Sequence, residues 1–239
     1  MHILDNVIWQ ALSTRQSEFA ESLGQSCRFT PEVSSLGGFR EASSEGYQSL
    51  EGLVGARGTI RIFLDSPYED RMGWTLLARA PLLQMVWENG HALNDSRVSS
   101  EARSEQEIVE LNAAHAPEMM ELTALTKPGP FDKRTHELGR YIGIFREGKL
   151  VAMAGERLKV PGYTEVSAVC THPEHTGHGY ARLLMADVMQ GIRRREEIPF
   201  LHVREGNARA IQLYERLVST ARAAAFGGDS EGIRNRLVA

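Results

Sequence analysis

The segment from Cys170 to Ala181, CTHPEHTGHGYA, places a glycine-rich turn between a strand-like run and a helix-like run. The run before it, Glu165–Thr171, favours a strand. The apolar positions from Tyr180 onward follow the i, i+3, i+4 spacing of a helix that buries one face. A strand, a tight turn and a helix start leave several backbone N–H groups without partners at one point. This arrangement can surround an anion such as a phosphate group.

The same segment also carries potential metal ligands. Cys170 and His172 are two positions apart on the expected strand, so they point to the same face, and His175 and His178 follow on the turn. One thiol and three imidazoles can hold Zn²⁺, but zinc sites usually draw ligand pairs from separated segments. We therefore expect no metal here and keep a zinc protein as an alternative.

The glycine turn fails both common phosphate-binding motifs, because Arg182 stands where a dinucleotide fingerprint needs glycine and the Gly-Lys-Ser/Thr of a P-loop is absent. The residues Thr176–Ala181 instead resemble the Gln/Arg-x-x-Gly-x-Gly/Ala turn of the GNAT superfamily of acyl-CoA-dependent N-acyltransferases, with His172-Pro-Glu174 before it. A second superfamily motif matches downstream, Asn207-x-x-Ala-x-x-x-Tyr-x-x-Leu217. The resemblance spans roughly residues 105–217. Within the superfamily, this part of the chain is similar to the C-terminal module of glycine N-acyltransferase-like enzymes.

The expected elements after the first hundred residues run strand, helix, three strands, helix, strand, helix. This order predicts an α/β (α+β) fold, with a mixed, mostly antiparallel sheet flanked by helices, as the resemblance also implies. The polar segment Ser96–Glu107 is the expected linker. We predict a smaller α/β domain over 1–98, the GNAT domain over 105–226 and an irregular tail over 227–239. By analogy with tandem members of the superfamily, one interpretation is that the first domain is a degenerate copy of the same fold.

Acyl transfer from a thioester to an amine needs a base, an oxyanion donor and an acid, because an alkyl ammonium has a pKa of about 10 and the leaving thiolate takes up a proton. The resemblance implies that Glu165 is the base, with Glu156 and His172 as competitors. It implies that Tyr214 donates a proton to the thiolate. Nothing in the sequence positions a base for Cys170 as a nucleophile, so direct transfer in a ternary complex is expected.

The resemblance also implies how the coenzyme binds. The backbone of Val169–Thr171 holds the pantetheine arm like an added strand, the glycine turn cradles the pyrophosphate, and Asn207 caps the last helix beside the coenzyme. The expected coenzyme-binding residues are Val169, Cys170, Thr171, Thr176, Gly177, His178, Gly179, Tyr180, Ala181 and Asn207. The expected lining of the acceptor pocket is Phe131, Thr135, Glu156 and the Pro128–Pro130 loop.

Composition excludes several functional classes. The chain has 239 residues and a formal net charge of −4, which gives no electrostatic footprint for nucleic acid. No window approaches the roughly 18 apolar residues that span a bilayer, and the stretch around Asp5 and Asn6 is not a signal peptide. Two distant cysteines form no disulfide framework. These features predict a soluble cytoplasmic monomer or homodimer without membrane or nucleic-acid partners.

The leading prediction is an acetyl-CoA- or acyl-CoA-dependent N-acyltransferase that acts on a primary amine of a small molecule or peptide. One alternative is a catalytically inactive relative that binds acyl-CoA in a regulatory role. Two departures favour it: Thr176 replaces a long polar residue, and the usual Gly-Phe is missing after Leu217. The second alternative is the zinc protein. The sequence leaves the acceptor open, because acceptor pockets are lined by variable loops.

Overall fold

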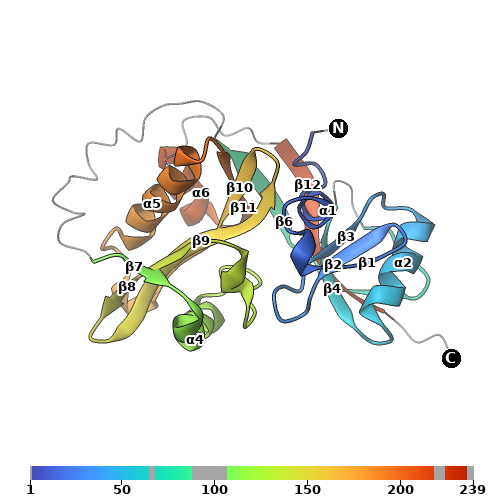
Figure 1. Ribbon diagram of the computed structural model, residues 1–239, viewed down its shortest axis with the longest axis horizontal. Helices are drawn as coiled ribbons and strands as arrows, with labels where there is room; N and C mark the ends of the chain where they lie inside the picture. The colour runs from blue at the N-terminus through green and yellow to red at the C-terminus, as the bar shows by residue number, and fades with distance from the viewer. Residues whose placement is uncertain (1, 65–67, 88–106, 218–223, 236–239) are drawn as a thin grey trace.

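The computed structural model of the chain describes residues 2–64, 68–87, 107–217 and 224–235 (Figure 1). The strands of its large sheet are β4 (Thr59–Phe63), β5 (Trp74–Ala78), β6 (Pro81–Val86), β7 (Val109–Leu111), β8 (Tyr141–Arg146), β9 (Lys149–Val160), β10 (Tyr163–Thr171), β11 (Ile198–Arg204) and β12 (Ala224–Asn235). A small sheet contains β1 (Ala20–Leu23), β2 (Ser26–Phe29) and β3 (Gly37–Phe39). The helices are α1 (Val7–Ser13), α2 (Ser44–Val54), α4 (Ala116–Thr126), α5 (Tyr180–Arg194) and α6 (Ala208–Leu217).

The C-terminal half of the chain forms an antiparallel meander, β7 to β10, between two layers of helices (Figure 1). Successive side chains of a strand point to opposite faces. Ile142 and Ile144 accordingly pack in the cluster that contains α5, whereas Tyr141 packs in the cluster that contains α4. Because both faces are covered, β9 is buried over most of its length. The prediction of a mixed sheet flanked by helices is confirmed.

The sheet opens between β10 and β11, which are parallel neighbours. Their register pairs Tyr163–Glu165 with Ile198–Phe200 and stops there. Beyond this point β10 stays paired with β9, while β11 runs alongside β6. The two strands therefore diverge, and the outer edge of β10 past Glu165 has no strand beside it within the described residues.

The expected domain boundaries do not match the sheet. β6, which belongs to the predicted first domain, pairs with β11, and β12 pairs with β4, β5 and β6. Residues 1–98 therefore do not close on themselves, and the tail expected from 227 is wrong as far as Asn235, because β12 continues to that residue. The remaining N-terminal elements are the small sheet with α1 and α2, a different arrangement from the meander. The expected linker lies almost wholly outside the described residues.

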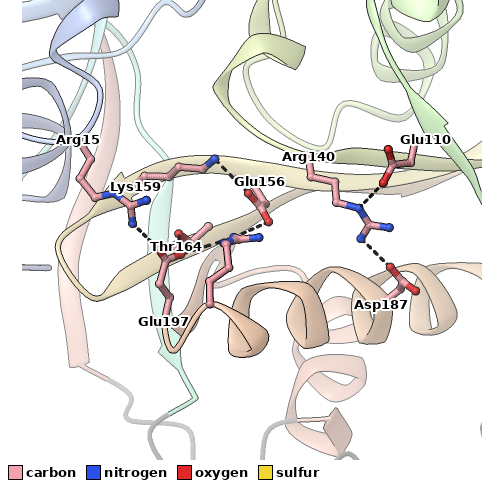
Figure 2. Close-up of polar contacts among 9 residues, drawn as sticks. Arg15, Glu110, Arg140, Glu156, Lys159, Thr164, Asp187 and Glu197 are labelled. Atoms are coloured by element: carbon pink, nitrogen blue, oxygen red, sulfur yellow. Dashed lines mark hydrogen bonds and ion pairs between the residues drawn. The ribbon is translucent and has the colours of Figure 1, made fainter.

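A buried polar network fixes the N-terminal segment to the base of the meander (Figure 2). Arg15 forms an ion pair with Glu197, and Glu197 accepts a hydrogen bond from the hydroxyl of Thr164 at 2.6 Å. Next to it, the buried side chain of Gln16 donates to the backbone oxygen of Arg157 at 2.7 Å and accepts from the backbone N–H of Lys159 at 3.1 Å. Gln16 thereby provides hydrogen-bond partners for backbone groups on the edge of β9 that lie beyond the end of β8.

A second ionic group holds α5 against the sheet. Arg140 bridges Asp187 of α5 at 2.6 Å and Glu110 of β7 at 2.9 Å (Figure 2). This contact links α5 to β7 beside the buried apolar face by which the helix packs on the meander. None of the helices in the described ranges has the length and apolar character needed to cross a membrane.

Candidate active site

A cleft of about 690 Å³ occupies the divergence of β10 and β11. One end is formed by the glycine turn and the first residues of α5 and α6, and the other end by β4, β11 and the loop after α4. The lining includes Arg61, Phe63, Lys127, Pro128, Gly129, Pro130, Arg157, Val169, Cys170, Thr171, Thr176, Gly177, Gly179, Tyr180, Ala181, Arg182, His202, Arg204, Asn207, Arg209 and Tyr214. Most of the residues predicted to bind the coenzyme therefore share one cavity.

A bulge in β10 shapes the wall of the cleft. The register with β9 shifts between Ser167 and Cys170, and Ala168 between them has a φ of 53°. A non-glycine residue at positive φ costs about 1 kcal/mol or more, and bulges of this kind re-aim a strand next to functional sites. Past the bulge, the backbone of Val169–Thr171 has a free edge toward the cavity. This edge fits the predicted added-strand contact with an extended ligand arm.

The glycine turn forms an anion cradle at the start of α5. Gly177 and Gly179 have φ values of 87° and 76°, and Gly179 is the N-cap of a helix that begins at Tyr180 without a side-chain cap. The first-turn N–H groups of α5 are therefore available to an anion, and the helix dipole adds a favourable potential. The hydroxyl of Thr176 is engaged locally, since it donates to the backbone oxygen of Pro173 at 3.1 Å. The cradle thus relies on backbone groups. His178 is exposed and stacks on Tyr180 without lining the cavity.

Beneath the other end of the cleft lies a buried group of three ionisable side chains. Arg157 donates from Nε and Nη2 to the two carboxylate oxygens of Glu165, each at 2.8 Å. Nδ1 of His202 lies 2.7 Å from Oε1 of the same carboxylate. The side chains of Arg157, Glu165 and His202 are 7%, 1% and 7% exposed, so the pair is shielded from water. Arg157 and His202 reach the cavity, whereas Glu165 lies behind them.

This geometry argues against Glu165 as the base. Burial alone would raise the pKa of its carboxyl, but the charge and hydrogen bonds of Arg157, with the hydrogen bond of His202, bring the pKa down to about 2. A carboxylate with so low a pKa, separated from the cavity, is a poor acceptor for a proton from an ammonium of pKa about 10. Glu165 instead positions Arg157 and His202 at the floor of the cleft.

His202 is held on both ring nitrogens. Nε2 lies 3.1 Å from Nε2 of Gln84, whose amide also donates to the backbone oxygen of Leu4 at 3.2 Å. Because this amide nitrogen is a donor, Nε2 of His202 accepts and Nδ1 carries the proton shared with Glu165. The ring also packs edge-on against Phe63 at 4.8 Å between centroids. The N-terminal segment and β4 therefore help to orient a cleft residue of β11.

Tyr214 and Cys170 lie near each other in the cleft, on α6 and β10. Burial, together with the nearby Cys170, raises the pKa of Tyr214 to about 12, so its hydroxyl keeps its proton at neutral pH. Burial raises the pKa of the Cys170 thiol to about 11, which disfavours the thiolate that a nucleophile needs. Asn207 caps α6 as expected, because its side chain accepts from the N–H of Ala210 at 3.2 Å.

The three residues expected around the acceptor lie outside the cavity lining. Thr135 is buried and donates to the backbone oxygen of Val33 at 2.6 Å, which ties the loop after α4 to the N-terminal segment. Glu156 is 1% exposed and pairs with Arg195 at 2.7 Å and Lys159 at 3.1 Å. Both side chains are engaged away from the cleft, whereas the loop 128–130 lines it, and the role of each in acceptor binding stays a prediction. Phe131 is half-buried and packs edge-on to Tyr141, next to the lining residue Pro130.

The histidines around the turn do not assemble into a metal centre. Within the described ranges there is no group of three or more His, Cys, Asp or Glu side chains that could hold an ion. The buried thiol of Cys170 is engaged with Thr126, while His172 and His175 stack edge-on to each other. This geometry therefore gives no support to the alternative of a zinc protein.

The cleft residues that the sequence reasoning missed include Arg61, Phe63, Arg157 and His202. Arg157 left a signal, since Glu156 and Arg157 follow the apolar run of residues 150–155 within one strand, and charges buried in a strand need partners. Arg61 and Phe63 alternate with buried Ile60 and Ile62, a pattern that marks one exposed face of β4 but does not reveal what that face meets.

Comparisons with known proteins agree with this architecture. Residues 141–225 match the family model described as FR47-like protein. A solved structure from Novosphingobium aromaticivorans, assigned to the GNAT family of acetyltransferases, is 32% identical over 99% of both chains, with a TM-score of 0.81. A GCN5-related N-acetyltransferase from Kribbella flavida shares the fold at 14% identity over 96% of both chains, with a TM-score of 0.58. No curated protein sequence matches the chain.

The similarity to the Novosphingobium structure extends over both halves of the chain, so it includes the N-terminal segment as well as the glycine turn. The more specific likeness to glycine N-acyltransferase-like enzymes stays a prediction. The diverging strands, the bulge and the glycine cradle meet in one cavity. Together with the 32% identity to the Novosphingobium structure over 99% of both chains, this shows that the chain belongs to the GNAT family of acetyltransferases.

Proposed function

We propose that this protein is an acyl-CoA-dependent N-acetyltransferase that acts by direct transfer in the cleft between β10 and β11. The observation that carries the proposal is the joint placement of the uncapped start of α5, the free edge of β10 and Tyr214 in one cavity. We expect the pyrophosphate of the coenzyme at the cradle, the pantetheine arm along Val169–Thr171 and the thioester beside the bulge.

The cleft lining also addresses the protonation of the amine. Its described residues include six cationic side chains, Arg61, Lys127, Arg157, Arg182, Arg204 and Arg209, and no Asp or Glu. Neighbouring positive charges disfavour an ammonium group, so the neutral amine is the form that this cavity favours. The proton that the nitrogen loses during transfer leaves to water in the cleft. His202 does not take this proton, because Glu165 and Gln84 engage both of its ring nitrogens.

The proposed reaction is a direct attack of the amine on the thioester, followed by departure of the thiolate. The nitrogen of the neutral amine forms a bond to the thioester carbonyl carbon while negative charge develops on the carbonyl oxygen, next to backbone N–H groups at the bulge. The nitrogen of the intermediate loses a proton to water in the cleft, and the carbon–sulfur bond breaks as the carbonyl forms again. The departing thiolate takes a proton from Tyr214, which gives free CoA and the acetylated amine.

Acetyl-CoA binding is the first test of this proposal. A ligand at about a hundred times its dissociation constant adds roughly 2.7 kcal/mol to the free energy of unfolding, so acetyl-CoA should raise the Tm clearly, and EDTA should leave it unchanged. Release of CoA with a panel of primary amines would then establish turnover. Binding of acetyl-CoA without turnover would favour the inactive regulatory relative. A lower Tm in EDTA would favour the zinc protein instead.

Gly177→Ala and Gly179→Ala test the cradle. A Cβ at either position meets no protein atom within 4 Å, so it would enter the space of the cleft that we assign to the coenzyme. We expect each variant to raise the Kd of acetyl-CoA by roughly tenfold or more, as loss of one charge-assisted hydrogen bond does. Isothermal titration would measure the change.

Gly148→Ala is the matched control for the cradle variants. Gly148 also has a positive φ, 75°, and open space around its Cβ position, but it lies in the turn between β8 and β9. All three variants should lose about 1 kcal/mol of stability from backbone strain. Only the two cradle variants should bind acetyl-CoA more weakly, and an equal effect of Gly148→Ala would contradict the assigned site.

A further inference from the structure

The acceptor end of the cleft has an uneven distribution of charge. Its walls are β4, the loop after α4 and the floor formed by Arg157 and His202. The whole chain has an excess of acidic residues, with a formal net charge of −4, yet the cavity lining within the described ranges has only cationic charged groups. Three of the cations, Arg182, Arg204 and Arg209, belong to or precede α5 and α6, at the cradle end. Arg61, Arg157 and the exposed Lys127 of the loop after α4 lie at the opposite end and need another explanation.

Arg157 presents an unused donor group at this end. Its Nε and Nη2 are taken by Glu165, whereas Nη1 has no hydrogen-bond partner among the described residues. Nη1 lies 3.8 Å from the position that a Cβ would take at Gly129, a residue of the loop that forms the roof. The guanidinium is 7% exposed and opens to the cavity. A buried, rigidly held arginine with one face toward a cavity is a strong binding group for a carboxylate.

Arg61 supplies a second cation from the opposite wall. Alternation along β4 buries Ile60 and Ile62 and turns Arg61 and Phe63 toward the cleft. Nη1 of Arg61 donates to the hydroxyl of Ser35 at 2.5 Å, which restricts its rotamers. Its charge also acts on Asp132 in the loop after α4, so Arg61 lies on the same side of the cavity as that loop. Phe63 packs against His202 and provides an apolar surface beside the two arginines.

The acidic groups near this end do not cancel its positive charge. Glu165 is fully engaged by Arg157 and His202. Asp132 is half-buried near Arg61 and offsets part of its charge, but it lies outside the cavity lining. A polyamine or a lysine side chain would therefore meet cations without a carboxylate to pair with, whereas an acceptor with its own carboxylate would neutralise them.

Resting on the proposed acetyl transfer, we infer that the acceptor is an amino carboxylate, an amine that carries its own carboxylate, and that Arg61 and Nη1 of Arg157 bind the carboxylate. The amine then points toward the bulge and the thioester, and Phe63 contacts the apolar part of the acceptor. Arg61 is thus a residue that determines specificity, contributed by the N-terminal half of the chain to a site whose donor end is built from the C-terminal half.

Matched acceptors test this inference. Glycine, phenylalanine and glutamate are compared with their α-carboxamides as acceptors for acetyl-CoA, by CoA release. The corresponding N-acetyl acids and N-acetyl amides are compared for binding to the protein loaded with CoA. We expect the acid of at least one pair to exceed its amide by roughly 10- to 100-fold in kcat/KM and in affinity, as charge-assisted bonds to two arginines provide.

Variants of Arg61 test where the acceptor carboxylate binds. Variants of Arg157 are unsuitable, because they leave Glu165 buried without its partner and are expected to unfold. Arg61→Ala should raise the KM of the acid at least tenfold with little change in kcat, in the KM of the amide or in the Kd of acetyl-CoA. Arg61→Lys should recover part of the loss, and Arg61→Glu should reverse the preference of acid over amide. Arg40→Ala, an exposed arginine of the same N-terminal segment outside the cleft lining, is the control that should change none of these.

The outcomes separate this inference from the proposed function. Equal or better use of amides and cationic amines, with no acid preference in either turnover or binding, would overturn the inference while acetyl transfer stands. A rise in the Kd of acetyl-CoA for Arg61→Ala, without an effect on the acceptor, would overturn it too, because Arg61 would then bind the coenzyme. An acid preference in a protein that binds no acetyl-CoA would keep the anion site and reject acetyl transfer.

Discussion

Glu165→Gln should lower the free energy of unfolding by about 3–5 kcal/mol at neutral pH, because it leaves the guanidinium of Arg157 buried without a counter-charge. The carboxylate is 1% exposed and accepts both guanidinium hydrogen bonds at 2.8 Å, so water cannot replace it. Urea unfolding at pH 7 would measure the loss. The double variant Glu165→Leu with Arg157→Met, which removes both charges, should recover much of it.

Glu137→Gln is the matched control for this change. Glu137 also pairs with an arginine, Arg134 at 2.7 Å, but both side chains are about a third or more exposed. An exposed pair of this kind contributes about 0–1 kcal/mol, so the same substitution should have little effect. If Glu165→Gln were no more costly than Glu137→Gln, the account of a shielded ion pair would be wrong.

The pH dependence of the Glu165 contribution has a defined sign. The pKa of the folded state, about 2, is below the ordinary value of 4.5, so the folded protein binds this proton more weakly than the unfolded chain. The stabilisation, about 3 kcal/mol, is complete above the unfolded value and is lost as the pH falls from about 4.5 to about 2. The difference in stability between the native protein and Glu165→Gln should therefore shrink over this window, which urea unfolding at a series of pH values would show.

Tyr214→Phe should lower the kcat of acetyl transfer by about 10²- to 10⁴-fold, the usual contribution of a positioned proton donor. The hydroxyl keeps its proton at neutral pH, since its pKa is about 12, and it shares the cleft with the free edge of β10. The Kd of acetyl-CoA should change little, because only the leaving thiolate needs this proton. Steady-state CoA release at saturating substrates would measure kcat.

Tyr163→Phe is the control for the tyrosine variant. Its hydroxyl lies 3.3 Å from Nε2 of His2, outside the cleft lining, so its loss should leave kcat unchanged. A Tyr214→Phe variant that kept most of its kcat and lost only stability would assign Tyr214 to core packing and would remove it from the mechanism.

The sequence predicted those parts of the site that are local in the chain. The glycine turn, the start of α5 at Tyr180 and the cap at Asn207 follow from residue type and spacing within a few positions, and each lies where it was expected. The environment of Glu165 could not be predicted in this way, because His202 comes from another strand and meets the carboxylate only when the sheet forms. The carboxylate at the expected spacing is buried and paired with Arg157 and His202, an environment that spacing alone does not indicate.

The domain boundaries failed for a related reason. β12 has a glycine-rich sequence without the alternation of a half-buried strand, and its identity depends on pairing with β4 and β6. The acceptor wall on β4 was missed because strand periodicity shows which face of a strand is exposed, but not which distant element that face approaches. Both β12 and the acceptor wall on β4 are defined by pairing between segments that are distant in the sequence, which local patterns do not show.

The position of β12 has a consequence for how this protein is made. β12 inserts between β4 and β6, two strands from the first part of the chain, and β6 in turn lies next to β11. A ribosome releases β4 and β6 long before it releases β12, so the large sheet stays incomplete until that late strand emerges. Pairings between such distant segments form slowly and expose strand edges in the meantime. The wall of the cleft on β4, which carries Arg61, therefore gains its pairing with β12 only after synthesis has passed that strand.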